Sequence, residues 1–276
     1  MKIQAIQIVR LALIFVAVGN PALQALPTAI PHGTVELVAE HNSIQPGNNF
    51  QVGLKFQLEK GWHIYWINPG DAGQPPRVTW NLPSGLSAGD ILWPYPKALS
   101  AFSLVDFGYE DEVLLLVPMQ ASTSLKPTAQ TNLSAYIKLI VCQDVCIPGK
   151  TSLSLSLPVT AQTPAANFSA QVSFEAARQK IPKPAPASWK FSVADRKDYF
   201  YLSAVVGRSI KEAFFFPLEE SQIENVTSQK VQLSKSGFAI ALKKSAQLTK
   251  PIQRLRGVLL LGDKAYKVNA PVVRSN

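Results

Sequence analysis

The sequence lacks any hydrophobic run long enough to cross a membrane. The apolar stretch from Leu11 to Val18 is far shorter than the roughly 20 residues that a transmembrane helix needs, and no other stretch approaches that length. The basic residues Lys2 and Arg10 precede this run and small residues follow it, which is the layout of an export signal. We therefore expect residues 1–25 to be a signal peptide and the mature chain to be exported, with no transmembrane segment.

The sequence also lacks clustered charge, although positive charge is in excess. Without Lys2 and Arg10, 25 of its 27 basic residues remain against 18 acidic ones, and they are scattered along the chain. A nucleic-acid-binding protein would gather Lys and Arg on one element with aromatic residues between them. No such stripe is present, so nucleic acid is not expected among the partners.

Cysteine is scarce, because Cys142 and Cys146 are the only two in the chain. In an exported protein, a lone close pair is most simply a disulfide that opens and closes. Residues four apart in a fully extended strand are separated by roughly 13 Å, about twice the Cα separation that a disulfide tolerates. The segment between the two cysteines must therefore curl back on itself if they are bonded.

Two other interpretations of the cysteine pair stay open. One is a structural staple, but a bond that closes only five residues restricts the unfolded chain little, which favours a redox role. The other is a metal site, which would usually need further ligands, and His32, His41 and His63 are distant in the sequence. Two thiolates alone would at most suit a soft ion such as Cu(I), so no metal ligand and no cofactor is assigned.

Short segments with strand character recur along the chain. Apolar and polar residues alternate in most of them, as they do in strands with one buried face. The segments are 50–58, 113–117, 136–141 and 151–157 in the first half and 199–206, 213–216, 237–242, 257–261 and 265–272 in the second. Short strands at this spacing are typical of β-sandwiches. We therefore predict an all-β protein with two sandwich domains in tandem.

The two domains are predicted to meet at a linker over residues 163–187. Its end, residues 181–187, has three alternating prolines, which favour a stiff connector outside any sheet, and residues around 172–180 could form a short helix. The predicted domains are residues 30–162, which contain the cysteines, and residues 188–276, without a catalytic role. Their cores are expected to fold independently.

The cysteine motif is predicted to lie between two strands. Segment 136–141 enters it, segment 151–157 leaves it, and Pro148-Gly149 is the expected turn. In thioredoxin-like proteins a C-x-x-C motif opens a helix, whereas here the spacing is C-x-x-x-C and a strand follows. The motif is therefore not that of a thioredoxin.

Five ordered segments of the first domain resemble a known family. They look like the N-terminal exported region of the thiol:disulfide interchange protein DsbD, and more closely like its ScsB-type relatives, the suppressor-of-copper-sensitivity proteins. The segments are Gly61–Gly73, Val78–Gly85, Leu92–Pro96, Phe107–Val113 and Val141–Pro148. A weaker resemblance to the second sandwich of the ScsB-type region continues through Phe214–Pro217, Leu255–Leu259 and Ala270-Pro271.

This resemblance implies an immunoglobulin-like redox domain in the periplasm. In that family the domain receives electrons from a membrane-embedded reductase domain through a thioredoxin-like domain, and it passes them to oxidised exported proteins through mixed disulfides. Carried over, Cys146 would bond to partner proteins and Cys142 would resolve the mixed disulfide. This chain has neither of the other two domains, so a separate membrane-embedded reductase is the expected electron donor. Thioredoxin-like periplasmic proteins are the expected partners.

The resemblance also points to residues around the sulfurs. The segment from Asp106 to Tyr109 lines up with the family's cap loop, in which an aromatic ring, here Phe107 or Tyr109, would shield the disulfide; the alternative is a core or turn aromatic. Tyr65 matches a tyrosine beside the disulfide, with a core aromatic as the alternative. Asp144 would, if close, raise the pKa of a cysteine thiol by like-charge repulsion, and is otherwise a solvated loop residue.

Two functions from different classes follow. The first is a thiol–disulfide oxidoreductase that passes reducing equivalents to partner proteins through a reversible Cys142–Cys146 disulfide. The second is a non-catalytic periplasmic binding module, for a partner protein or Cu(I), whose disulfide is only a staple.

Overall fold

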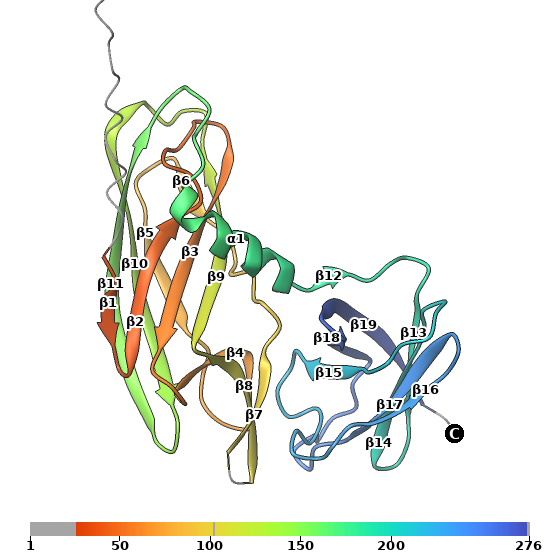
Figure 1. Ribbon diagram of the computed structural model, residues 1–276. Coiled ribbons are helices and arrows are strands. Elements are labelled where there is room, and N and C mark those ends of the chain that lie inside the picture. Colours follow the sequence, from red (N-terminus) through yellow and green to blue (C-terminus); the bar gives the residue numbers. More distant parts are fainter. Residues whose placement is uncertain (1–25, 102, 275–276) are drawn as a thin grey trace, which may run out of the picture.

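The computed structural model describes residues 26–101 and 103–274, so the predicted signal peptide lies outside the described residues. The described chain forms two β-sandwich lobes side by side, with one helix over the first lobe (Figure 1). The all-β prediction with two sandwich domains is therefore confirmed.

Two facing sheets make up the first lobe. Its strands are β1 (Thr28–Ile30), β2 (Gly33–Ala39), β3 (Asn49–Leu58), β4 (His63–Gly70), β5 (Arg77–Asn81), β6 (Leu86–Ala88), β7 (Lys97–Ala101), β8 (Leu104–Glu110), β9 (Glu112–Ala121), β10 (Thr128–Cys142) and β11 (Cys146–Val159). One sheet has the order β1-β2-β3-β9-β6. The other has the order β11-β10-β4-β8-β7, and β5 also pairs with β10.

Most strands bury one face, as the alternating pattern predicts. In β10 every second residue points into the core, namely Leu133, Ala135, Ile137, Leu139 and Val141. β4 and β8 depart from this pattern, because consecutive residues of both strands are buried. Their outward faces must therefore be covered as well, and this cover forms part of the candidate site.

The chain between the lobes is packed against both of them. α1 (Phe168–Lys180) begins before the predicted helical segment and rests on β9, where Ala170, Phe174 and Ala177 cluster with Leu114 and Leu116. After it, β12 (Lys183–Pro184) pairs in parallel with β19 (Lys264–Arg274). The expectation that the proline-rich connector lies outside any sheet is therefore wrong over these two residues. Pro184 is tolerated there because β12 is an edge strand, which leaves one side of its backbone unpaired.

In the second lobe, β19 joins the two halves of the sheet. The remaining strands are β13 (Lys190–Asp195), β14 (Tyr199–Val205), β15 (Phe214–Pro217), β16 (Lys230–Leu233), β17 (Gly237–Lys243) and β18 (Arg254–Leu261). Their order is β15-β18-β19-β13-β14-β17-β16. The beginning of β19 pairs with β18 in antiparallel fashion, whereas its last three residues, 272–274, run parallel to β13. The five strands predicted in this half all coincide with observed strands within a few residues.

The cores of the two lobes touch through β15. Phe215 points into the core of its own lobe, whereas its neighbour Phe216 belongs to the hydrophobic cluster of the first lobe. The ring centroid of Phe216 lies 5.2 Å from that of Phe107 and 6.2 Å from that of Trp66, both in edge-on geometry. Asn68 adds a buried hydrogen bond, because its side-chain amide donates to the carbonyl oxygen of Pro217 at 2.9 Å. The two cores are therefore distinct but in contact, and their independent folding stays a prediction.

We expect Phe216→Ala to loosen the first lobe although the residue lies in the second. Removing a buried phenylalanine ring costs about 3–5 kcal/mol, and here part of that loss falls on Trp66 and Phe107. Amide hydrogen exchange in β4 and β8 should become roughly tenfold faster or more. Phe215→Ala is the matched control, and its main effect should appear in its own lobe. Unchanged exchange in β4 and β8 of Phe216→Ala would mean that the lobes are independent after all.

Candidate functional site

The two cysteines form a disulfide across the end of a β-hairpin. Cys142 is the last residue of β10 and Cys146 the first of β11, and the two stand directly opposite each other with Cα atoms 4.2 Å apart. The chain thus curls back between them, as the spacing requires. The turn, however, consists of residues 143–145, because Pro148 and Gly149 lie inside β11 opposite Ile140 and Leu139. The prediction of a turn at Pro148-Gly149 is therefore wrong.

The two cysteines differ sharply in accessibility. Cys142 is 1 % exposed, because β10 continues into the sheet and Cys142 also stands opposite His63 of β4. Cys146 is exposed, because β11 is the edge strand of that sheet. Its neighbour Val145 in the turn is 61 % exposed. A large reactant can therefore approach Cys146 far more easily than Cys142.

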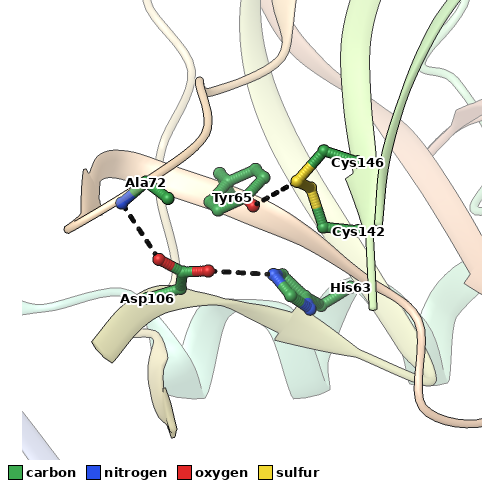
Figure 2. Close-up of a disulfide and its surroundings, with 6 residues drawn as sticks. All are labelled: His63, Tyr65, Ala72, Asp106, Cys142 and Cys146. Atoms are coloured by element: carbon green, nitrogen blue, oxygen red, sulfur yellow. Dashed lines mark hydrogen bonds and ion pairs between the residues drawn. A yellow bond between two sulfur atoms is a disulfide. The ribbon is translucent and has the colours of Figure 1, made fainter. Parts of the chain in front are cut away.

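Tyr65 of β4 lies beside the disulfide. Its hydroxyl donates to the sulfur of Cys146 at 3.6 Å (Figure 2). Burial raises the pKa of Tyr65, and the nearby carboxylate of Asp106 raises it further. Tyr65 therefore keeps its proton throughout the physiological pH range and remains a hydrogen-bond donor. The structure places Tyr65 beside the disulfide, as the resemblance implied.

Two buried polar side chains complete this face of the sheet. Asp106 of β8 accepts a hydrogen bond from the backbone N–H of Ala72 at 3.1 Å, and its other oxygen lies 3.6 Å from Nε2 of His63 (Figure 2). The ring of His63 stands edge-on to that of Tyr65, with centroids 5.0 Å apart. His63 was not among the predicted site residues. Its period-two spacing from Tyr65, which puts both residues on one face of a strand, is the signal that could have found it.

A loop after β4, residues 71–76, covers Tyr65. Gly73 lies against the tyrosine ring so closely that a Cβ atom there would be 2.0 Å from Cζ, and its φ of +79° also favours glycine. Asp71 anchors the loop to the first lobe by accepting the backbone N–H of Val105 at 2.8 Å. From the second lobe, the side-chain amide of Asn225 donates to the other oxygen of Asp71, also at 2.8 Å. Both lobes therefore hold the loop that covers Tyr65.

The aromatic rings of the expected cap lie elsewhere. Phe107 and Tyr109 alternate with Asp106 along β8, so they point to the opposite face, into the core. Phe107 packs against Trp66 and Phe216, and the hydroxyl of Tyr109 donates to the carbonyl oxygen of Pro94 at 2.6 Å. In this structure both rings occupy the core, which is the alternative left open for them, and a role as a shield over the sulfurs stays a prediction.

The remaining site expectations concern charge, metal and membrane. Asp144 is an exposed residue of the turn between the cysteines, and its effect on thiol pKa stays a prediction. The described residues contain no group of three or more His, Cys, Asp or Glu side chains that could hold a metal ion. Within the same residues, no helix has both the length and the apolar character needed to cross a membrane.

Fold and site together define an immunoglobulin-like sandwich domain with an accessible disulfide at the end of a hairpin. Residues 34–158, most of the first lobe, match the family model described as thiol:disulfide interchange protein DsbD, N-terminal. The predicted resemblance is confirmed.

Among solved structures, the N-terminal periplasmic domain of ScsB from Proteus mirabilis is 20 % identical, with a TM-score of 0.68 over 93 % of this chain and 100 % of that chain. The two-lobed fold is therefore shared with that domain. The periplasmic chaperone SfaE (9 % identical, 87 % and 100 % covered) and the major pilin subunit BcpA of Bacillus cereus (12 %, 88 % and 68 %) give TM-scores of only 0.24 and 0.29. A search of curated proteins found no match.

We expect Tyr65→Phe to raise the pKa of the Cys146 thiol in the reduced protein. The lost hydroxyl can no longer donate to the thiolate, and hydrogen bonds to charged groups are worth about 1.5–3 kcal/mol, or roughly one pKa unit for a partly solvated sulfur. The pH dependence of alkylation of the reduced protein measures this pKa. Tyr136→Phe, on the exposed face of β10, is the control and should leave it unchanged. An unaltered pKa in Tyr65→Phe would show that the hydroxyl does not reach the thiolate.

Proposed function

We propose that this protein is a periplasmic thiol–disulfide exchange protein that passes reducing equivalents to partner proteins through a reversible Cys142–Cys146 disulfide. The observation that carries this proposal is the unequal exposure of the two cysteines at the end of the hairpin. A structural staple has no need for one open sulfur. The family of the first lobe supports the same class of chemistry.

The exchange takes two steps. In the reduced protein the Cys146 thiolate attacks one sulfur of a partner's disulfide, which breaks that bond, forms a mixed disulfide and releases the partner's other sulfur as a thiolate. The Cys142 thiolate then attacks Cys146, which restores the internal disulfide and releases the partner's first sulfur. The partner gains two electrons and takes up two protons from solvent. This protein is oxidised in the same turnover.

Each residue of the site has a role in this scheme. Cys146 is the attacking residue because it is exposed, and Cys142 is the resolving residue because it lies buried beside it. Tyr65 stays protonated, so its hydroxyl stabilises the thiolate of Cys146 by hydrogen bonding. The carboxylate of Asp106 helps to raise the pKa of Tyr65 and so keeps this hydroxyl protonated. Asp144 in the turn opposes a nearby thiolate by its charge.

The partners follow from the chemistry and the family. Reduced protein must be regenerated, so an electron donor is required, and we propose a separate membrane-embedded reductase. Thioredoxin-like periplasmic proteins are the proposed acceptors or carriers, because the C-x-x-C motif of such proteins is reactive in thiol–disulfide exchange. Export by the segment 1–25 would place the protein in the oxidising compartment where such exchange is useful.

We expect Cys142→Ser to accumulate a mixed disulfide with partner proteins through Cys146. Without the resolving thiol, release of the partner depends on outside thiols and is slow, whereas Cys146→Ser leaves only the buried Cys142 and should trap roughly tenfold less. Non-reducing gels of both variants from the native host, followed by peptide mapping of the adducts, measure the difference.

The variant that lacks both cysteines sets the background of this experiment. Equal trapping by the two single variants would remove the assignment of roles to the two sulfurs. Absence of adducts in both would favour a binding module with a structural disulfide.

A further inference from the structure

Three basic residues form a row across the outward face that carries the disulfide. The strand register places Arg77 of β5 opposite Lys138 of β10, and Lys138 opposite Lys150 of β11. All three side chains are exposed. The three strands contain no Asp or Glu at all, so no acidic side chain of these strands neutralises the row.

Without a bound partner, the row destabilises the folded protein. Like charges directly opposite each other in a sheet are destabilising. None of the three residues forms an ion pair with any described residue. The ammonium group of Lys138 makes a cation–π contact, 5.9 Å from the ring centroid of Tyr136. An anionic partner would relieve this repulsion.

The row borders a hollow of about 500 Å³, whose lining comes within two residues of each cysteine along the hairpin. Ile140 and Pro148 give it apolar lining, and Pro75, from the loop that covers Tyr65, lies on its other side. Along the hairpin the opposed pairs follow one another on this face as Lys138 with Lys150, Ile140 with Pro148, and Cys142 with Cys146. The lysine pair is thus four residues, or about 13 Å, from the disulfide along the hairpin. A partner whose disulfide contacts the sulfur of Cys146 can therefore reach these cations as well.

We propose that this hollow, which we call the basic hollow, binds an acidic segment of the exchange partner while its disulfide reacts with Cys146. The proposal rests on the proposed function and adds the charge of the partner surface. The positive charge of the row favours an acidic segment of polypeptide. The apolar lining suits the apolar side chains of such a segment. A second copy of this chain is a poor occupant, because the chain has 27 basic and 18 acidic residues and would repel itself. Such complementarity speeds association and selects partners more than it raises affinity.

Two synthetic peptide disulfides test this proposal. Both have the same sequence around a single cysteine, linked as a symmetric dimer, with three Glu residues near the cysteine in one and three Lys residues in the other. At low salt the reduced protein should react about tenfold faster with the acidic peptide, because electrostatic steering raises association rates by 10-fold or more. The preference should vanish near 1 M salt, where the screening length is about 3 Å.

The triple variant Arg77→Glu, Lys138→Glu, Lys150→Glu should lose or reverse this preference. Its neutral counterpart Arg77→Gln, Lys138→Gln, Lys150→Gln should lose the preference without reversing it, and it serves if the acidic variant does not fold. The control variant Lys211→Glu, Lys230→Glu, Lys235→Glu changes the net charge equally at three exposed lysines of the second lobe. It should keep the preference.

Equal rates for the two peptides with the unmodified protein would overturn the basic hollow as a docking site. Equal loss of preference in the control variant would do the same, because net charge alone would then explain the effect. If the reduced protein reacts with neither peptide, the proposed function itself fails, and the docking proposal fails with it.

Discussion

β10 and β11 pair in one uninterrupted register from Thr131 and Leu157 to Cys142 and Cys146, and the site depends on that register. It puts alternate residues of both strands into the core and leaves the others on the outward face. A slip by one residue would turn every core residue outward and move the cysteines off their opposed positions. The hydrophobic core of the first lobe therefore fixes the geometry of the disulfide, although the disulfide itself lies at the surface.

The unequal environment of the two sulfurs follows from strand order. β10 has β4 on one side and β11 on the other, whereas β11 is an edge. The order in which the strands pair thus buries Cys142 and leaves Cys146 exposed. The loop 71–76 covers Tyr65 beside the sulfurs, and Asn225 ties that loop to the second lobe. The second lobe has no cysteine, yet it contributes to the shape of the redox site.

The sequence allowed prediction of the elements whose pattern is local. Segment 151–157 was predicted as a strand because its leucines alternate with polar residues, and it lies within β11. The turn was misplaced, because Pro148-Gly149 is a strong turn signal, but an unpaired strand edge tolerates proline. Phe107 or Tyr109 was expected to be a cap ring, because the motif does not show which face of β8 either ring occupies. The contact of Phe216 with Trp66 joins residues 150 positions apart, and no local pattern predicts such a contact.

A redox titration of the disulfide tests the central claim most directly. The protein is equilibrated in buffers of increasing reducing strength, free thiols are alkylated, and mass measurement gives the reduced fraction while circular dichroism reports the fold. We predict that the Cys142–Cys146 bond opens and closes reversibly in the folded protein, at a reduction potential above about −300 mV. Structural disulfides that resist reduction typically have potentials below this value. A bond that stays oxidised in the most reducing buffer, with the fold intact, would contradict it and identify a structural staple.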